Sequence, residues 1–408
     1  MRHSSELIRG NQISRACVIT LVVLLVLAGC ATREDKAKRA PAVAPAPEVA
    51  ATPPLAAPAL REASWSDLPG WREDDTALAW EAFMRSCGAI GDEIGWQSVC
   101  DAAQTLANPD QQRARDFFEA HFRPYRVVDV KGYDEGLITG YYEPLLRGSR
   151  TPDSRYRYPV YGVPHDPLTI DLAKLYPELQ GKRLRGRVEG QRVVPYYDRA
   201  QIERGSGALA GKELVWVDDP IELFFLQIQG SGRVVLDTGE VLRLGYADSN
   251  GHPYSSIGKQ LVDRGDLPLE RASMQGIKDW ARRNPGRVRE LLDHNASYVF
   301  FRELPGDLPG PIGALGVPLT PRRSVAVDKR IVPLGAPVFI ATTYPLTDAP
   351  LNRLMLAQDT GGAIRGAVRA DFFWGFGDDA AREAGRMKQP LHMWVLLPLD
   401  YSVPAAAR

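Results

Sequence analysis

The feature that most constrains the fold is a long succession of short β-rich runs, interrupted by Gly and Pro, from about residue 125 onward. The run over residues 234–244 turns at Asp237-Thr238-Gly239 and predicts a β-hairpin. Further runs lie at residues 192–194, 214–217 and 224–229 and in a block over residues 298–397. Short strands with Gly-rich turns and no internal repeat favour barrels over a doubly wound parallel sheet or a propeller. We therefore expect a mainly β protein.

Helices are expected where apolar residues recur at intervals of three and four. This spacing occurs over residues 76–86 and 98–122, ahead of the strands, and over residues 256–292, between the two β-rich blocks. The helical segments should therefore flank the β structure rather than alternate with single strands.

The N-terminus has the pattern of a lipoprotein signal. Arginines precede an apolar run at residues 16–27, and Leu27-Ala28-Gly29-Cys30 fits a lipobox. The run is too short to span a bilayer of roughly 30 Å unaided. We expect a signal peptide at residues 1–29, acylation of Cys30 and an outer-membrane lipoprotein that faces the periplasm, because Ala31 rather than Asp follows the Cys. An ordinary signal peptide or an uncleaved anchor is the alternative.

Residues 30–62 are rich in Ala and Pro and lack apolar periodicity, which predicts an extended tether. Beyond the signal, the chain has a formal charge of about minus two, because residues 1–29 carry three Arg and one Glu while the whole chain balances. No basic surface for nucleic acid is expected. The six histidines show no ligand spacing, so we expect neither a metal nor another cofactor.

Two cysteines remain for the folded body once Cys17 leaves with the signal and Cys30 is acylated. Cys87 and Cys100 should form a disulfide in an oxidising compartment, with two free buried thiols as the alternative. Closing so short a loop would stabilise the fold by about 3 kcal/mol on the chain-entropy estimate.

Three aspartates of the C-terminal block each close a β-like run of the sequence: Asp328, Asp359 and Asp371. Carboxylates at strand ends can project into a cleft, although Asp beside Gly is also ordinary turn chemistry. Asp371 precedes Phe372, Phe373 and Trp374. Such surroundings desolvate a carboxyl and raise its pKa towards the working range of a general acid.

This block resembles the C-terminal three-Asp domain of the membrane-bound lytic murein transglycosylase A family. The most specific strings are Asp359-Thr-Gly-Gly-Ala-Ile-Arg-Gly and Arg369-Ala-Asp371-Phe-Phe. The resemblance extends over about residues 65–400, with further similar blocks in the same order at residues 138–144, 225–232, 245–259 and 295–301. Several ordered blocks together make chance agreement improbable.

The resemblance implies a double-psi β-barrel domain with an inserted, smaller β-barrel domain and a large groove between them. Residues 63–137, with the N-terminal helices, and residues 298–408, the three-Asp part, would build the first domain, and residues 138–297 the insert. It also implies cleavage of the β-1,4 bond between N-acetylmuramic acid and N-acetylglucosamine in peptidoglycan, without water, to a 1,6-anhydromuramic acid end. The expected partners are glycan strands and, through Cys30, a lipid membrane.

In this resemblance Asp371 matches the catalytic acid, and Asp359 would support it. A glycosidase that uses water needs a second carboxylate as base or nucleophile. In the lytic reaction one carboxyl can protonate the leaving oxygen and then take the proton of the muramic acid 6-hydroxyl.

Candidate substrate-binding residues lie elsewhere in the chain. Aromatic faces suit pyranose rings, and amide or hydroxyl groups suit sugar oxygens, although a buried core tyrosine is an equal alternative. Residues 229–232 read as a strand end where backbone approaches a ligand. For Asp328, a turn or barrel-crossover role is favoured over catalysis. The candidates are Tyr141, Tyr142, Glu143, Gln229, Gly230, Ser231 and Asp328.

Three other functions fit parts of the pattern. Asp-Thr-Gly occurs at Asp237 and Asp359, as in an aspartic peptidase, but the flanks of the two copies differ. A non-catalytic glycan-binding lipoprotein could share the fold, since fold does not decide function. A hydrolytic muramidase would differ in its products alone.

Overall fold

The computed structural model describes residues 59–179, 182 and 184–403. The expected signal peptide, Cys30 and most of the tether lie outside these residues. The last four residues of the expected tether form strand β1 (Ala59–Glu62), which pairs antiparallel with β2 (Phe122–Val128). The tether prediction is therefore wrong at its end, where the apolar side chain of Leu60 is buried in the core. In the described part of the chain, no helix is long and apolar enough to cross a membrane.

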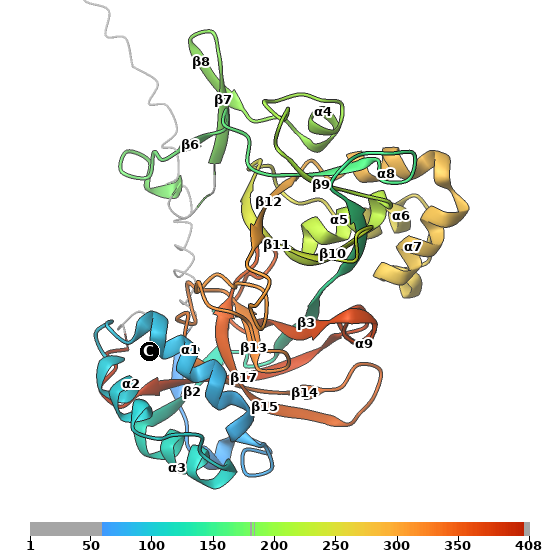
Figure 1. Cartoon of the computed structure of the whole chain (residues 1–408). Helices are drawn as coiled ribbons and strands as arrows, with labels where there is room; N and C mark the ends of the chain where they lie inside the picture. The colour runs from blue at the N-terminus through green and yellow to red at the C-terminus, as the bar shows by residue number, and fades with distance from the viewer. Residues whose placement is uncertain (1–58, 180–181, 183, 404–408) are drawn as a thin grey trace, which may run out of the picture. The chain divides into compact units, whose positions relative to one another are not determined.

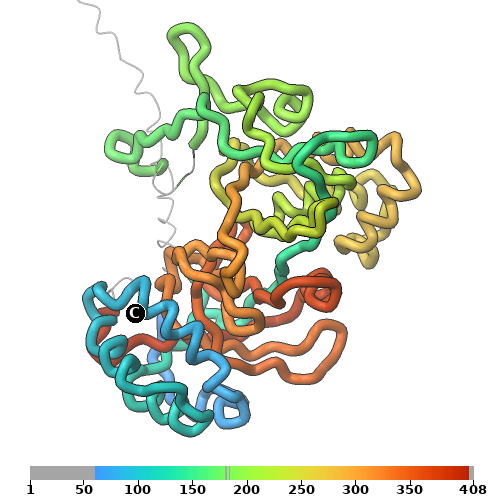
Figure 2. The backbone as a smooth tube through the Cα atoms, in the orientation of Figure 1, coloured from blue at the N-terminus to red at the C-terminus, as the bar shows by residue number. Residues whose placement is uncertain are grey.

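The first sheet has eight strands in the order β1-β2-β17-β14-β15-β13-β16-β3. Strand β17 also pairs with β3, so six of these strands close into a ring. The sheet as a whole joins strands from both ends of the described chain, as the blue-to-red colouring in Figure 2 lets the reader follow. The six strands of the ring are β3 (Gly136–Glu143), β13 (Ser324–Val327), β14 (Pro337–Thr343), β15 (Pro350–Asp359), β16 (Arg369–Phe376) and β17 (Lys388–Pro398). The expectation of a mainly β protein is confirmed, and the double-psi crossing of the strands stays a prediction.

A second sheet has six strands in the order β12-β11-β10-β4-β9-β5, and an isolated bridge between Gly162 and Phe301 links its two edges. The predicted hairpin is confirmed, with Gly239 in the left-handed region at its turn. A third sheet contains β6, β7 and β8 (Figure 1). The bounds are β4 (Leu145–Ser149), β5 (Tyr158–Tyr161), β6 (Leu168–Ile170), β7 (Leu184–Glu189), β8 (Arg192–Pro195), β9 (Glu213–Val217), β10 (Ser231–Leu236), β11 (Val241–Ser249) and β12 (Val299–Leu304).

Strand pairing moves the boundaries of the insert. We expected the insert at residues 138–297, but β3 pairs within the first sheet and β12 pairs with β11 of the second. By pairing, the inserted part runs from about Pro144 to Leu304. The segment of residues 298–304 therefore belongs with the insert rather than with the three-Asp part.

The N-terminal helices are α1 (Trp80–Ile90), α2 (Gln97–Gln104) and α3 (Gln111–His121). The single helix expected over residues 98–122 is wrong, because the chain breaks between α2 and α3. Asn108 has a positive φ, Pro109 follows without an N–H, and the Asp110 side chain caps α3 by accepting from the N–H of Arg113.

Residues 224–229, read as a strand, instead belong to α5 (Pro220–Gln229). Asp219 caps this helix by accepting from two backbone N–H groups, Pro220 is its first residue, and Gly230 ends it in the left-handed region. Leu223 and Leu226 pack in one buried cluster while Phe224 and Phe225 pack in another. A helix that is buried on two sides loses its amphipathic period, which explains the error.

The remaining helices are short. The interlude expected over residues 256–292 contains three of them, and α9 packs on β3 and β16. The α-helices are α4 (Arg199–Glu203), α6 (Ile257–Asp263), α7 (Met274–Arg283), α8 (Val288–Asp293) and α9 (Gly377–Ala384). The 3-10 helices are Trp65–Asp67, Thr76–Ala79, Pro177–Leu179, Leu269–Arg271 and Pro285–Arg287.

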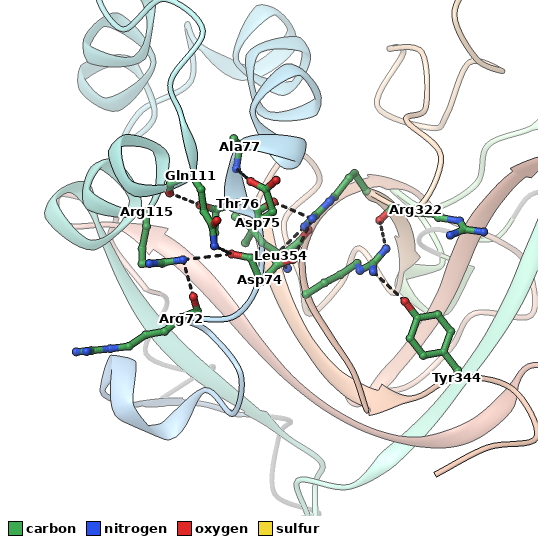
Figure 3. A network of polar contacts seen from close by, with 12 residues as sticks. Arg72, Asp74, Asp75, Thr76, Ala77, Gln111, Arg115, Arg322, Tyr344 and Leu354 are labelled. Atoms are coloured by element: carbon green, nitrogen blue, oxygen red, sulfur yellow. Dashed lines mark hydrogen bonds and ion pairs between the residues drawn. The ribbon is translucent and has the colours of Figure 1, made fainter. Parts of the chain in front are cut away.

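Two links fasten the N-terminal helical part. Cys87 of α1 and Cys100 of α2 form a disulfide, with Cα atoms 5.4 Å apart. The buried guanidinium of Arg323 donates to both carboxylate oxygens of Asp74, at 2.8 and 2.9 Å. The N–H of Leu354 donates to the same carboxylate, and Figure 3 labels Asp74 and Leu354 in this network. Because this buried pair is fully hydrogen-bonded, removing one partner would leave an uncompensated charge. The network holds the strand that carries Asp359 against the helical part.

Candidate active site

The candidate site lies on four adjacent strands of the first sheet, in the order β15-β13-β16-β3. Ala326 of β13 pairs with Asp359 on one side and with Asp371 on the other, and Asp371 pairs in turn with Thr139. Residues opposite one another on neighbouring strands point to the same face. The four side chains therefore form a row, with the small Ala326 between the two carboxyl groups.

A β-bulge brings Asp359 into this row. Between the pairs Val325 with Ala357 and Ala326 with Asp359, strand β15 has one extra residue, Gln358. The Gln358 amide is buried, donating to the carbonyl of Ala82 and to the hydroxyl of Ser86. Bulges re-aim side chains and occur preferentially beside active sites.

Asp371 is partly buried and hydrogen-bonded. The hydroxyl of Thr139 donates to its Oδ1 at 2.6 Å, and Arg369 Nη2 donates to that same hydroxyl oxygen at 2.9 Å. Burial raises the pKa of Asp371 to about 6, and the negative Asp359 adds to the rise, while the Thr139 hydrogen bond and the charge of Arg369 oppose it. The raised pKa expected from the sequence is thus present.

The raised pKa of Asp371 does not depend on all three aromatic residues that follow it in the sequence. Phe372 and Trp374 point to the other face of β16 and stack in the core, with ring centroids 4.6 Å apart. Only Phe373 shares the face of Asp371, where it packs 5.1 Å from the ring of Tyr141. Asp371 also lies third in β16 rather than at the end of a strand, so that part of the sequence expectation is wrong.

Asp359 ends β15 and has three donors. Its Oδ1 accepts from the N–H groups of Ala314 and Thr360, both at 2.9 Å, and its Oδ2 accepts from the hydroxyl of Tyr141 at 3.0 Å. Burial raises the pKa of Asp359 although these hydrogen bonds oppose it. Burial also raises the pKa of Tyr141, as do the nearby Asp359 and Asp371, so its hydroxyl remains a donor.

Asp328 has a different environment from the other two aspartates. Its carboxylate is buried and accepts from the side chain of Arg330 and from the N–H of Gly366, the latter at 2.9 Å. Burial by itself would raise its pKa, but the hydrogen bonds from Arg330 and Gly366 outweigh it and lower the pKa of Asp328 to about 2. Asp328 therefore fixes the loop before β16, and its buried carboxylate does not face a ligand.

The other candidate binding residues are mostly enclosed by protein. Glu143 is 1% exposed and pairs with Arg233 Nε at 2.8 Å and Arg243 Nη2 at 3.7 Å. The hydroxyl of Tyr142 donates to the sulfur of Met274 at 3.2 Å. Tyr142 and Glu143 are therefore core residues at the end of β3, the alternative left open for the tyrosines by the sequence.

Gln229, Gly230 and Ser231 do not end a strand as expected. They end α5 and begin β10, because Gly230 adopts the left-handed conformation that terminates a helix. The carbonyl oxygen of the Gln229 side chain accepts from the N–H of Tyr142 at 3.1 Å, which joins the insert to the end of β3.

Sequence reasoning missed Thr139, Arg369 and Ala326. Thr139 lies two residues before Tyr141 and Arg369 two residues before Asp371, so each shares a strand face with its neighbour. This alternation was a usable signal once β3 and β16 were assigned. The small side chain of Ala326 carries no such signal, because only strand pairing puts it between two aspartates.

Both halves of this site match family models. Residues 137–302 match the MltA specific insert domain, and residues 323–397 match the 3D domain. The membrane-bound lytic murein transglycosylase A of Vibrio cholerae is 34% identical over 267 residues, 64% of this chain and 65% of that protein. The aligned region thus spans slightly less than two thirds of this relative.

Solved structures extend the similarity to most of the described chain. The crystal structure of MltA from Neisseria gonorrhoeae aligns with a TM-score of 0.74 and 40% identity, covering 86% of this chain and 98% of that one. E. coli MltA with bound chitohexaose aligns with a TM-score of 0.57 and 27% identity, covering 82% and 88%. With both domain models matched and nearly the whole of the Neisseria structure covered, this chain belongs to the membrane-bound lytic murein transglycosylase A family.

Proposed function

We propose that this chain is a peptidoglycan lytic transglycosylase with Asp371 as its catalytic acid. The observation that carries the assignment is the partly buried Asp371 carboxyl, with a pKa raised to about 6 and a second carboxyl in the same row. Family membership supports the reaction class, and the chitohexaose bound to E. coli MltA supports a glycan substrate.

The proposed reaction uses one carboxyl group twice, first as an acid and then as a base. Protonated Asp371 donates to the glycosidic oxygen of the β-1,4 bond, which breaks between C1 of N-acetylmuramic acid and the oxygen of N-acetylglucosamine. The Asp371 carboxylate then takes the proton of the muramic acid 6-hydroxyl as that oxygen bonds to C1. No water is consumed, and the product ends in 1,6-anhydromuramic acid. At pH 7 a carboxyl with a pKa of about 6 is protonated in about one molecule in ten, enough to act as an acid.

Hydrogen bonding defines the acidic oxygen of Asp371. The lone pair of the Thr139 hydroxyl accepts from Arg369, so its proton points to Oδ1 of Asp371. The acidic proton is then carried by Oδ2. Asp359 supports Asp371 electrostatically, because its negative charge raises the pKa of Asp371.

Localisation forms part of the same proposal. The lipobox at Cys30 and the names of the membrane-bound relatives support a lipid-anchored protein, and Ala31 supports the outer membrane and the periplasm. A wall-facing enzyme on a tether would reach its insoluble substrate while staying on the membrane. The double-psi barrel and the groove beside the row of aspartates complete the proposal.

The test is digestion of purified peptidoglycan by the mature chain, residues 30–408, followed by mass spectrometry of the released muropeptides. Asp371→Asn is the test variant, and Asp237→Asn, an exposed turn aspartate, is the matched control. We expect anhydro ends from the wild type and from the control and at least about 100-fold fewer from Asp371→Asn. Undiminished activity in Asp371→Asn would move the acid elsewhere.

The products also distinguish the alternatives. Reducing ends in place of anhydro ends would indicate a hydrolytic muramidase, and retained binding without release would indicate a glycan-binding protein. The aspartic peptidase reading requires Asp237 and Asp359 to share a proton. Asp237 lies exposed in the β10–β11 turn, whereas Asp359 is paired with Tyr141 and backbone N–H groups. Release of peptide fragments rather than glycan fragments, lost in Asp237→Asn, would revive that reading.

A further inference from the structure

The three-stranded sheet β6–β8 separates its side chains by polarity. Opposed pairs put Leu168 beside Gly186, Ile170 beside Leu184 and Val188 beside Val193 on one face. We call this the aliphatic face, composed of Leu168, Ile170, Leu184, Gly186, Val188, Val193 and Pro195. The opposite, polar face consists of Thr169, Arg185, Arg187, Glu189, Arg192 and Val194.

The polar face is the one that packs on the rest of the insert. Arg185 pairs with Asp248 of β11 through two nitrogens, at 2.9 and 3.0 Å. The guanidinium of Arg187 lies 4.1 Å from the ring centre of Tyr197. The aliphatic face therefore points away from these contacts, the reverse of an ordinary sheet that covers a core with its apolar side.

Four residues of the aliphatic face, including Pro195, are solvent-exposed, Ile170 and Leu184 are half-buried, and Gly186 is buried. Val188 is 62%, Val193 56% and Leu168 39% exposed. Among the residues that the structure describes, none of the seven belongs to a buried hydrophobic cluster. A contiguous exposed apolar patch bordered by polar residues marks an interaction surface.

We propose that the aliphatic face docks on the surface of a lipid bilayer. This rests on the lipid anchor at Cys30 in the proposed function. The 28 residues from 31 to 58 between the anchor and β1 reach at most about 100 Å when fully extended, so the folded body stays near the membrane. The segment after β6 adds exposed Leu175 and Tyr176 beside Lys174, the side-chain mixture that favours the headgroup region.

Two other occupants fit less well. A stable interface with a second copy buries about 20–30 residues on each side, whereas the aliphatic face has seven. A glycan would find aliphatic side chains rather than the aromatic rings that suit pyranose faces. Shallow insertion into a bilayer requires only an apolar surface of this kind. Because the anchor already holds the chain at the membrane, docking of the aliphatic face is an intramolecular step with a smaller entropic cost.

The experiment uses the full mature, acylated chain with one fluorescent label. With Cys30 acylated and Cys87 bonded to Cys100, an introduced cysteine is the single free thiol of that chain. Val193→Cys carries an environment-sensitive nitrobenzoxadiazole label, and Val241→Cys, an exposed valine of the second sheet, is the matched control. The vesicles are phosphatidylethanolamine with phosphatidylglycerol, with and without a spin-labelled lipid as quencher.

We expect blue-shifted emission and several-fold stronger lipid quenching at position 193 than at position 241, and weaker quenching when Val188→Glu is added. Equal quenching at the two positions overturns the docking. A blue shift at position 193 that the lipid quencher does not affect, but that grows with protein concentration, would show that a second copy covers the face. That result would also overturn the docking on lipid. If the acylated chain does not bind vesicles, the anchor and the docking both fail. Murein digestion by the same samples tests the proposed activity independently.

Discussion

Two regions of the three-Asp block each bury a carboxyl group, but they shift its pKa in opposite directions. In the row of β15, β13, β16 and β3, Asp371 accepts one neutral hydroxyl hydrogen bond beside another carboxylate, and its pKa rises to about 6. In the loop after β13, Asp328 accepts from a guanidinium and from backbone N–H groups, and its pKa falls to about 2. Burial is common to both, so the donors decide which carboxyl can release a proton near neutral pH.

The largest difference between the two regions should appear in turnover. Asp371→Asn removes the group that donates and accepts the proton, so we expect kcat to fall about 100- to 10,000-fold. Asp328→Asn retains the shape of a loop residue, and we expect kcat to change less than about tenfold. The measurement is the initial rate of release of anhydro-muropeptides.

Circular dichroism and thermal unfolding of both variants provide the control, because an unfolded protein would also be inactive. A folded Asp328→Asn with the same loss as Asp371→Asn would contradict the separation of roles.

The second difference concerns pH. Because the acid must be protonated, the rate should fall about tenfold per pH unit above about 6, the pKa of Asp371. Thr139→Val removes the hydrogen bond that favours the carboxylate, so the pKa of Asp371 should rise and the alkaline limb of the profile should move to higher pH. Thr139→Ser keeps the hydroxyl and should restore the wild-type limb. An unmoved limb in Thr139→Val would show that another group titrates.

The third difference concerns stability, with opposite signs in the two regions. The folded pKa of Asp371 is raised, so its contribution to stability is present at low pH and lost as pH rises through about 6. The folded pKa of Asp328 is depressed, so its contribution is present at neutral pH and lost as pH falls through about 2. At pH 7 we expect Asp371→Asn to raise the free energy of unfolding and Asp328→Asn to lower it, each by about 1–3 kcal/mol.

Urea denaturation at pH 7 and at pH 3 checks both signs. At pH 3 the gain in Asp371→Asn should largely disappear, since the wild-type carboxyl is then mostly neutral in both the folded and the unfolded chain. A gain of the same size at both pH values would mean that packing, not ionisation, is responsible.

The contrast between the two regions also shows what sequence reasoning could reach. The aromatic run after Asp371 predicted a raised pKa, and the pairing of Cys87 with Cys100 followed from counting cysteines. The apolar run at residues 224–229 was predicted to be a strand but lies in α5, because a helix buried on two sides shows no 3.6-residue period of apolar residues.

The hydrogen-bond donors around each carboxyl could not be predicted from the sequence, for a different reason. Thr139 and Asp371 are 232 residues apart in sequence, and only the pairing of β3 with β16 joins them. Arg330, by contrast, is two residues from Asp328, yet its ion pair depends on the turn that Asp328 itself caps. The sign of each pKa shift is therefore a property of strand order and local turns rather than of composition.

The smallest effect should also be the most specific. Tyr141→Phe removes one of the hydrogen bonds that stabilise the Asp359 carboxylate, so the pKa of Asp359 should rise and its negative charge should diminish. Because that charge raises the pKa of Asp371, the alkaline limb should move slightly to lower pH, opposite in direction to Thr139→Val, with kcat within about tenfold of wild type. The pH profiles of the two variants, measured side by side, check this. Movement in the same direction would mean that the titrating proton belongs to Asp359, and the acid would then be sought on β15 rather than on β16.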